Sequence, residues 1–332
     1  MEYKISVVIP FYNCEKYIKR AIDSVLNQNR NDVLIILSDD GSTDKSIKIC
    51  EEYVQKYPNI KLIKAANSGP SGARNRGIDA AEGDYIIFLD ADDEFSTGYI
   101  DGLAQIDHER QMAICARVMQ YSAKPAVAVN VPKKLISIGE FIKGSLKGDI
   151  SPIAAFTGPV NRMYSLKLIK ENGLKFDTSY RYGEDTLFNL EYLFLTKNIS
   201  LTDGCYICHE TEGSLSKSFS ANKYKCYPRL KQQMSELIST YCNNDKDVML
   251  SRARYWTDNF FARCYEVLDS AMDKREKAAN LDFIVKSGIV SKDDILTARG
   301  NKFAFVLLSD IIKIKSGKLL FWWFVIAPKI GV

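Results

Sequence analysis

The chain lacks a strong net charge, internal repeats and low-complexity segments. Its 332 residues include 45 lysines and arginines against 41 acids, a formal net charge of +4, and so mild an excess does not indicate a dedicated nucleic-acid-binding protein. Hydrophobic residues make up 46% and charged residues 26% of the chain, which is the composition of a soluble globular protein. Its length allows one large domain or two ordinary ones.

The chain also lacks an apolar run long enough to cross a bilayer. The run at residues 319–327 has nine apolar residues, whereas a spanning helix needs about 20. The surrounding tail, residues 299–332, holds six basic residues against one acid and mixes lysines with tryptophans and aliphatic side chains. This pattern favours a segment lying in a membrane interface; the alternative is a C-terminal helix packed on its own domain.

No secretory signal is evident, because residues 1–4 lead directly into a strand pattern. The eight cysteines are therefore expected to be reduced thiols of a cytosolic protein. Cys205 to His209 match the C-x-x-C-H pattern of haem attachment, but they lie in an expected strand. The second C-x-x-C pair of a structural zinc site is also missing. We expect reduced cysteines in a strand instead.

The first 120 residues alternate between strand and helix patterns. Short apolar runs predict strands, and apolar residues at helical spacing predict the helices between them. Nearly continuous apolar runs suit strands that are buried on both faces of a sheet. The order predicts an α/β fold with a doubly wound, mainly parallel sheet and helices on both faces. The expected strands are 5–9, 33–37, 60–63 and 84–89, and the expected helices are 15–28, 44–56 and 71–81.

The pattern loosens after this region and becomes helical near the end of the chain. Residues 122–150 lack a clear period and are interpreted as a variable insertion. From about residue 221 onward the chain is expected to be helical, with an apolar stripe in 249–271 that is typical of core packing. Between these regions we expect helices at 97–108 and 184–196 and strands at 112–121 and 200–208.

Three acids follow the fourth expected strand. The apolar run from Tyr85 to Leu89 ends in Asp90, Asp92 and Asp93. Ligands of open α/β sheets bind at this edge, and clustered carboxylates repel one another unless a cation neutralises them. A few carboxylates, water and a diphosphate together form a usual site for Mg²⁺ or Mn²⁺. The alternative is an acidic surface turn.

Two other motifs lie at the same expected edge. Asp39 and Asp40 follow the second strand, where an aspartate can accept hydrogen bonds from a nucleobase and a ribose. Helix capping by Ser42 or Thr43 is the alternative, although it does not explain the paired aspartates. Arg74 lies in a segment of small residues that opens a helix, which suits phosphate oxygens. The alternative for that segment is a plain glycine turn.

Two further motifs are weak when taken alone. Pro10 ends the first strand, and the ring of Tyr12 is available for stacking. Glu184 and Asp185 open a helix that is otherwise apolar, where a carboxylate can act as a general base. The alternative for these two acids is ordinary N-terminal capping.

Together these motifs resemble those of a family 2 glycosyltransferase with the GT-A fold. The resemblance is most specific over 5–95 and looser over 157–217. It implies a catalytic domain at 1–218, with a nucleotide-sugar half at 1–95 and an acceptor half at 96–218, followed by a helical region at 219–332. The stretches that carry it are 6–13, 39–44, 72–77, 88–93 and 183–185.

The resemblance also implies donor-site roles. Pro10, Tyr12 and Asp39 would line the pocket of the nucleotide base, with Asp40 beside them. Arg74 would lie near the base or the phosphates. Residues 90–92, with Ala91 between the two aspartates, would be the D-x-D motif, in which Asp90 faces the ribose.

The remaining implied roles concern the metal and the proton. Asp92 would be a direct ligand of Mn²⁺ or Mg²⁺, and His209 would complete the metal shell, as a histidine does in some members. Asp185 would be the catalytic base, supported by Glu184. The other histidine, His108, is interpreted as a surface residue.

The expected activity is inverting transfer of a sugar from a nucleotide sugar, a UDP-sugar by resemblance, to a hydroxyl of a glycan acceptor. A lipid-linked acceptor at the cytoplasmic face of the inner membrane would suit the tail at 299–332, as in capsule, exopolysaccharide or lipopolysaccharide synthesis. One alternative is a sugar nucleotidyltransferase, but residues 10–13 do not form its glycine-rich triphosphate loop. The other is a non-catalytic scaffold protein that binds nucleotide sugars.

Overall fold

The computed structural model divides the chain into two compact units. Unit 1 comprises Met1–Phe141 and Ile150–Leu215, and unit 2 comprises Ile142–Asp149 and Ser216–Val332. His108 lies outside the described residues, so its expected surface position stays a prediction. The structure describes residues 4–104, 111–121, 124–128, 134–147, 158–209, 225–243, 245–300 and 303–326.

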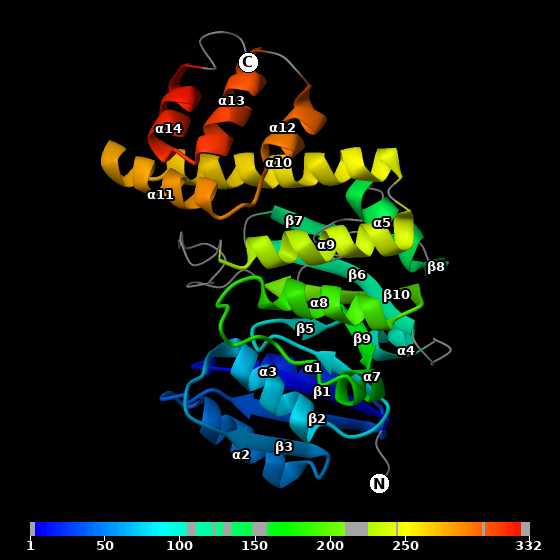
Figure 1. Ribbon diagram of the computed structural model, residues 1–332. Coiled ribbons are helices and arrows are strands. Elements are labelled where there is room, and N and C mark those ends of the chain that lie inside the picture. Colours follow the sequence, from blue (N-terminus) through cyan, green and yellow to red (C-terminus); the bar gives the residue numbers. More distant parts are fainter. Residues whose placement is uncertain are drawn as a thin grey trace. The chain divides into compact units, whose positions relative to one another are not determined.

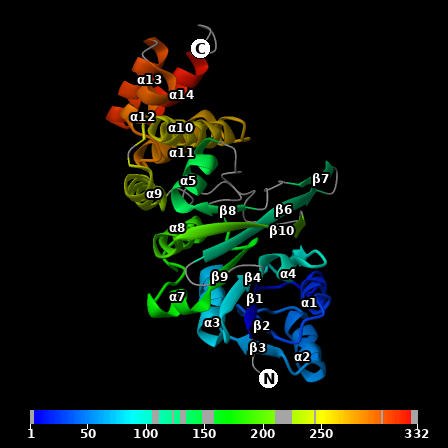
Figure 2. The ribbon, with the colours of Figure 1, turned by 90° about the vertical axis from the view of Figure 1, so that its right-hand side faces the viewer.

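One half of the sheet of unit 1 is parallel. Its strand order is β3-β2-β1-β4, and each neighbouring pair runs in the same direction. Because the chain reverses its direction of travel across the sheet after β3, α1 and α2 cover one face and α3 covers the other (Figure 2). The strands are β1 (Ile5–Phe11), β2 (Val33–Asp39), β3 (Ile60–Lys64) and β4 (Tyr85–Phe88), and the helices are α1 (Ile18–Leu26), α2 (Ser46–Lys56) and α3 (Gly69–Ala80).

The other half of the sheet is mixed. The short β9 lies antiparallel between β4 and β6, and β6 pairs in parallel with β10. The strands β5, β7 and β8 add antiparallel pairs at its margins (Figure 1). The expectation of a doubly wound, mainly parallel sheet is thus confirmed. These strands are β5 (Glu94–Phe95), β6 (Gln111–Tyr121), β7 (Lys124–Ala128), β8 (Lys134–Ser137), β9 (Arg162–Ser165) and β10 (Asn198–His209).

The segment 122–150, whose sequence has no clear period, contains β7, β8 and the helix α5 (Ile138–Lys147) among its described residues. Its two strands are short, so their period is too brief to detect in the sequence. That this segment is a variable insertion stays a prediction. The helix expected at 97–108 is present as the shorter α4 (Tyr99–Leu103), and residues 105–108 lie outside the described residues. Unit 1 also contains α7 (Leu166–Glu171) and α8 (Glu184–Leu195), whereas α5 begins in unit 1 and continues into unit 2 from Ile142.

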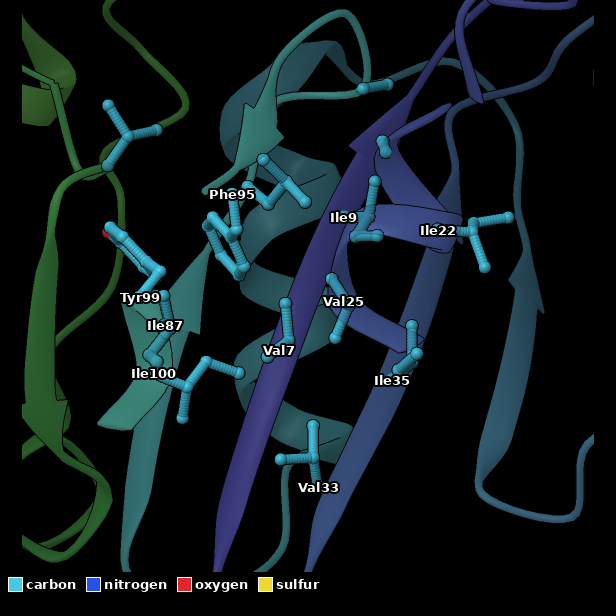
Figure 3. Close-up of a cluster of buried hydrophobic side chains, with 14 of the residues drawn as sticks. Val7, Ile9, Ile22, Val25, Val33, Ile35, Ile87, Phe95, Tyr99 and Ile100 are labelled. Carbon is cyan, nitrogen blue, oxygen red and sulfur yellow. The ribbon is translucent and has the colours of Figure 1, made fainter. Parts of the chain in front are cut away.

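The core of unit 1 lies between the parallel strands and α1. All seven residues of β1 and all seven of β2 are buried. Val7 and Ile9 of β1 share this core with Ile22 and Val25 of α1 (Figure 3). Full burial of each such side chain contributes roughly 1.5–3 kcal/mol, so this layer holds the strand ends, and the loops that follow them, in fixed positions.

The opposite face of β1 is packed against α3 at a glycine. A Cβ atom at Gly77 would lie 2.2 Å from Cγ1 of Val8, far closer than two carbon atoms approach without a shift of the backbone. The absence of a side chain at Gly77 therefore brings α3 directly onto the sheet. This contact fixes the position of the helix that carries Arg74.

Unit 2 is helical, as predicted for the residues after 221. Its core contains the apolar stripe of α10, including Trp256, Phe260 and Cys264, so this stripe packs in the interior as expected. No helix among the described residues is long and apolar enough to cross a membrane. The helices are α9 (Tyr227–Cys242), α10 (Lys246–Leu268), α11 (Lys274–Lys286), α12 (Lys292–Arg299), α13 (Phe303–Ile314) and α14 (Gly317–Ile326).

Candidate functional site

The loops after β1, β2 and β4 meet at the carboxyl edge of the parallel half. Phe11 at the end of β1 pairs with Asp39 at the end of β2, and Val8 pairs with Phe88 of β4. Two acidic stretches therefore lie at one edge: the first acidic segment, residues 39–44, and the second acidic segment, residues 90–94.

The first acidic segment is tied to the loop after β1. Asn13, with a left-handed φ of 50°, donates its backbone N–H to Ser42 Oγ at 3.0 Å, and Thr43 N–H donates to Asn13 Oδ1 at 2.8 Å. The prediction that Ser42 or Thr43 caps α2 was wrong, because this helix begins at Ser46 without a side-chain cap. Tyr12 remains 48% exposed beside this contact, so its ring is available for stacking.

Asp39 and Asp40 are both buried at this edge and accept hydrogen bonds mainly from backbone N–H groups. The Asp39 carboxylate accepts from the backbone of Gly41 at 3.1 Å and of Ser42 at 3.0 Å. The Asp40 carboxylate accepts from the backbone of Ser68 at 2.9 Å and of Gly69 at 2.8 Å, and Arg76 lies 2.9 Å away. Asp40 thereby holds the beginning of α3 against the end of β2.

Arg74 connects three elements of unit 1. The residue is only 8% exposed, and its guanidinium lies 3.0 Å from the Asp90 carboxylate and 3.4 Å from the Glu184 carboxylate. It also lies over the ring of Phe176, with 5.5 Å between Cζ and the ring centroid. Burial lowers its pKa, but Asp90 and Glu184 outweigh this effect and raise it overall. Arg74 is thus a fixed positive charge shared between α3, the second acidic segment and α8.

The second acidic segment is anchored to β10 through Asp93. Its carboxylate accepts a hydrogen bond from Tyr206 Oη at 2.9 Å and another from the backbone of His209 at 2.9 Å. Burial, together with the charges of Asp90 and Asp92, raises the pKa of Asp93 to about 7. The sequence places Asp93 in the run of acids that could face a cation, without a separate role of its own. Its two partners lie more than 110 residues away, so no local pattern reveals them.

His209 lies next to this segment but contacts a different acid. Its Nε2 is 2.8 Å from Glu94 Oε1, and the two residues come from the paired strands β10 and β5. Arg20 of α1 donates a hydrogen bond to the carbonyl oxygen of Asp92. Within the described ranges, no group of three or more His, Cys, Asp or Glu side chains is arranged to hold a metal. The role of His209 as a metal ligand stays a prediction.

Glu184 and Asp185 open α8 after Gly183, whose φ is 80°. Burial and the charge of Asp185 raise the pKa of Glu184 to about 7, against the opposing effect of Arg74. The Asp185 carboxylate accepts hydrogen bonds from the backbone of Gly158 at 2.9 Å and of Thr186 at 2.6 Å. These bonds fix the orientation of Asp185, and Arg74 joins Glu184 to Asp90 across the site.

The C-x-x-C-H sequence does not form a compact ligand set. Cys205 and Cys208 are three residues apart on β10, so their side chains point to opposite faces of the sheet. Both are free thiols, and Cys208 is buried. This geometry agrees with the interpretation of these residues as reduced cysteines in a strand.

The sheet topology, with acids, an arginine and a second acid pair at its carboxyl edge, is typical of the GT-A class. The chain belongs to glycosyl transferase family 2, whose sequence model matches residues 6–172. It is 34% identical over 219 residues to the uncharacterized glycosyltransferase EpsJ of Bacillus subtilis, a match that covers 64% of this chain and 63% of that protein. Family membership follows from the matched half of the chain.

A second relative carries a more specific name. The poly(ribitol-phosphate) beta-glucosyltransferase of Bacillus spizizenii is 34% identical over 205 residues, which are 60% of this chain and 31% of that protein. The chain thus spans less than two thirds of the length of both curated relatives.

Solved structures share the fold at low sequence identity. TarS residues 1–349 of S. aureus in complex with UDP has a TM-score of 0.71 and 19% identity, with 98% of this chain and 91% of that chain covered. The complex of the same protein with UDP-GlcNAc has a TM-score of 0.72 and 20% identity, with 98% and 92% covered. The GT-A fold expected from the sequence is confirmed.

Proposed function

We propose that this protein is an inverting glycosyltransferase that moves a sugar from a UDP-sugar to a hydroxyl of a surface-glycan acceptor. The observation that carries this proposal is the position of Arg74, which lies between the second acidic segment and the acid pair of α8. A donor diphosphate at the carboxyl edge and a base on α8 would then both face the buried guanidinium of Arg74.

The proposed proton transfer uses the acid pair of α8. Asp185 takes the proton from the acceptor hydroxyl as its oxygen attacks the anomeric carbon, and one displacement from the opposite face inverts the configuration. The backbone N–H groups of Gly158 and Thr186 orient the carboxylate of Asp185 for this step. Arg74 places positive charge near the departing diphosphate, which needs no protonation.

The residues of the second acidic segment fit a divalent cation. Asp90, Asp92 and Asp93 bring three carboxylates to this segment, and burial together with the charges of Asp90 and Asp92 raises the pKa of Asp93 to about 7. Mg²⁺ sites use one or two carboxylates together with substrate phosphates, so a set of three protein ligands is not required. Asp92 would hold Mn²⁺ or Mg²⁺, and His209 would join it by leaving Glu94. When bound, such an ion neutralises charge on the leaving group.

The substrate classes follow from the relatives. UDP and UDP-GlcNAc are named with TarS, and poly(ribitol phosphate) is named with the Bacillus spizizenii enzyme. We therefore place the present protein in the assembly of a teichoic acid or another bacterial surface glycan, with UDP as the donor nucleotide. A lipid-linked acceptor glycan at the cytoplasmic face of the membrane agrees with the basic, aromatic tail.

The activity is tested by following UDP release from UDP-GlcNAc and UDP-glucose with Mn²⁺. Wild-type protein should release UDP, and Asp185→Asn should lower the rate roughly 10²- to 10⁴-fold, because it removes a general base. Glu171→Gln, an exposed acid on α7, is the matched control and should keep the wild-type rate.

Three results would contradict parts of this proposal. Loss of UDP binding by Asp185→Asn to the same extent as turnover would make the base assignment wrong. Absence of UDP release by the wild-type protein from either donor would favour the scaffold alternative. Release of diphosphate from a nucleoside triphosphate and a sugar phosphate would favour the nucleotidyltransferase.

The tail both packs on unit 2 and exposes an apolar surface. Trp323 and Phe324 of α14 are buried, and both contact Phe261 of α10. The tail surface, which we assign to an anionic membrane interface, carries apolar side chains at helical spacing and lysines beside them. Its exposed residues are Leu307, Lys313, Ile314, Lys315, Lys318, Leu319, Trp322 and Ile326.

Vesicle sedimentation tests this assignment. Wild-type protein should sediment with phosphatidylglycerol vesicles more than with phosphatidylcholine vesicles, because the lysines attract anionic headgroups. Trp322→Ser should weaken this binding several-fold, whereas Phe283→Ser, which changes an exposed aromatic of α11, should not. Equal binding to both vesicle types, or equal effects of both variants, would show that the tail surface is not a membrane contact.

A further inference from the structure

A cavity of about 770 Å³ lies between α1 and the residues that follow the second acidic segment. Lys16, Lys19 and Arg20 line one side, and Glu94 and Phe95 line another. The volume lies within the range of roughly 300–1,000 Å³ that is usual for small-molecule sites. We call it the cation-lined cavity.

Hydrogen bonds between α1 and the segment after β5 hold the floor of this cavity in place. Ser24 Oγ accepts a hydrogen bond from the backbone of Phe95 at 3.1 Å. The Gln28 side chain donates to the carbonyl oxygen of Ser96 at 2.9 Å and accepts from the backbone of Ile100 at 3.3 Å. Gln28 is buried, so these bonds are shielded from water. The cavity is therefore already formed without a ligand.

The charge that the cavity offers to a ligand is positive. Lys19 and Arg20 lie in the first turn of α1, and Lys16 lies in the turn that precedes this helix. The lining holds three basic side chains against two acids, Asp23 and Glu94, and Asp23 already accepts a hydrogen bond from Tyr53 Oη at 2.6 Å. Lys16 and Lys19 are exposed, and within the described part of the chain neither forms an ion pair.

The cavity adjoins the donor site but is separate from it. Arg20, one of its lining residues, donates a hydrogen bond to the carbonyl oxygen of Asp92. Glu94 directly follows the three aspartates. The lining includes none of the residues predicted to bind the nucleotide sugar. A ligand in the cavity would lie beside the reacting centre and could not be the donor diphosphate.

We propose that the cation-lined cavity binds a phosphate group of an anionic acceptor glycan, such as a polyol phosphate chain. This inference rests on the proposed function. It specifies that the acceptor is anionic and where one of its phosphates binds. Lysine ammonium groups bind phosphate as point charges, and Arg20 adds a planar guanidinium. The phosphate anchors the acceptor while a hydroxyl of the same chain reaches the acid pair of α8.

The test measures binding of a fluorescein-labelled ribitol phosphate hexamer by anisotropy, with UDP and Mn²⁺ present to saturate the donor site. The double variant Lys16→Glu and Lys19→Glu should bind the hexamer about tenfold more weakly than wild-type protein, and raised salt should weaken wild-type binding. The matched control is Lys45→Glu with Lys48→Glu, two exposed lysines with the same spacing outside the cavity, and it should change affinity less than twofold. An unlabelled neutral maltohexaose should not compete.

Equal weakening in the two double variants, or no binding by wild-type protein, would overturn the cavity proposal. Inorganic phosphate and the unlabelled hexamer should also be compared as competitors at equal concentrations of phosphate groups. If both displace the labelled hexamer equally well, the cavity is a simple anion site and the cavity proposal is overturned. A UDP-induced rise in Tm, measured in each variant, separates this proposal from the proposed function. If UDP stabilises wild-type protein and the hexamer result fails, the cavity proposal alone is wrong; if UDP has no effect, the proposed function fails.

Discussion

The two acidic segments lie at the same sheet edge and have similar compositions, yet their carboxylates have different surroundings. In the first segment, the buried Asp39 and Asp40 accept hydrogen bonds from four backbone N–H groups in all. In the second, Asp90 is bonded to Arg74, and Asp93 is bonded to a phenol and one backbone amide. Burial, together with the charges of Asp90 and Asp92, raises the pKa of Asp93 in the second segment to about 7.

This difference agrees with the proposal that the first segment is a scaffold and the second a binding site. Backbone N–H groups stabilise a carboxylate permanently and fix the loops that donate them, as Asp40 fixes the beginning of α3. The carboxylates of the second segment contact side chains from other elements, Arg74 and Tyr206, as well as one backbone amide. An acid cluster at a strand end is therefore informative only together with the partners of each carboxylate.

The largest effect on stability is expected when the first segment is broken. Asp40→Ala should lower the free energy of unfolding by about 2–4 kcal/mol, because buried N–H groups of Ser68 and Gly69 lose their acceptor. Urea unfolding measures this change. Asp79→Ala, which removes an exposed ion pair with Lys175, is the control and should cost under about 1 kcal/mol. Similar costs in both variants would contradict the scaffold role of Asp40.

A smaller, pH-dependent effect is expected where the second segment reaches α8 through Arg74. The pKa of Glu184 is raised by burial and by Asp185 from 4.5 to about 7, so its ionisation opposes folding. Its contribution to stability is complete below pH 4.5 and is lost as the pH rises through 7. The free energy of unfolding of wild-type protein should therefore fall from pH 5 to pH 8.

Glu184→Gln should reduce this fall by on the order of 1 kcal/mol, since glutamine does not ionise. Urea unfolding at several pH values measures the slope, and Glu171→Gln, an exposed acid, should leave the slope unchanged. Identical slopes in wild-type protein and Glu184→Gln would show that ionisation of Glu184 does not contribute to the fall in stability.

The parallel half of the fold was predictable because its signals are local. Each of β1 to β4 is a single apolar run, and each helix between them keeps its own spacing, so 5–89 were assigned correctly in type and order. The two strands of the region 122–150 were not, because β7 and β8 are short and β8 pairs with the distant β10. The helix expected at 97–108 was found at Tyr99–Leu103, so its type was predictable and its bounds were not.

The candidate site was predictable only as a set of motifs. The sequence indicated which acids cluster at strand ends, but not which of them have backbone partners. Ser42 and Thr43 resembled helix caps locally, yet Asn13, which they contact, lies 29 and 30 residues away. Arg74 and Glu184 are 110 residues apart, so their contact follows only from the fold.

The most direct test of the account is the dependence of UDP binding on a divalent cation at the second acidic segment. The Tm of wild-type protein with UDP should rise when Mn²⁺ is present and should not rise with EDTA, because a ligand stabilises the state that it binds. Asp92→Ala should lose this rise, and Asp79→Ala should keep it. An equal rise with Mn²⁺ and with EDTA, retained in Asp92→Ala, would contradict the proposal that the second segment is a cation-dependent donor site.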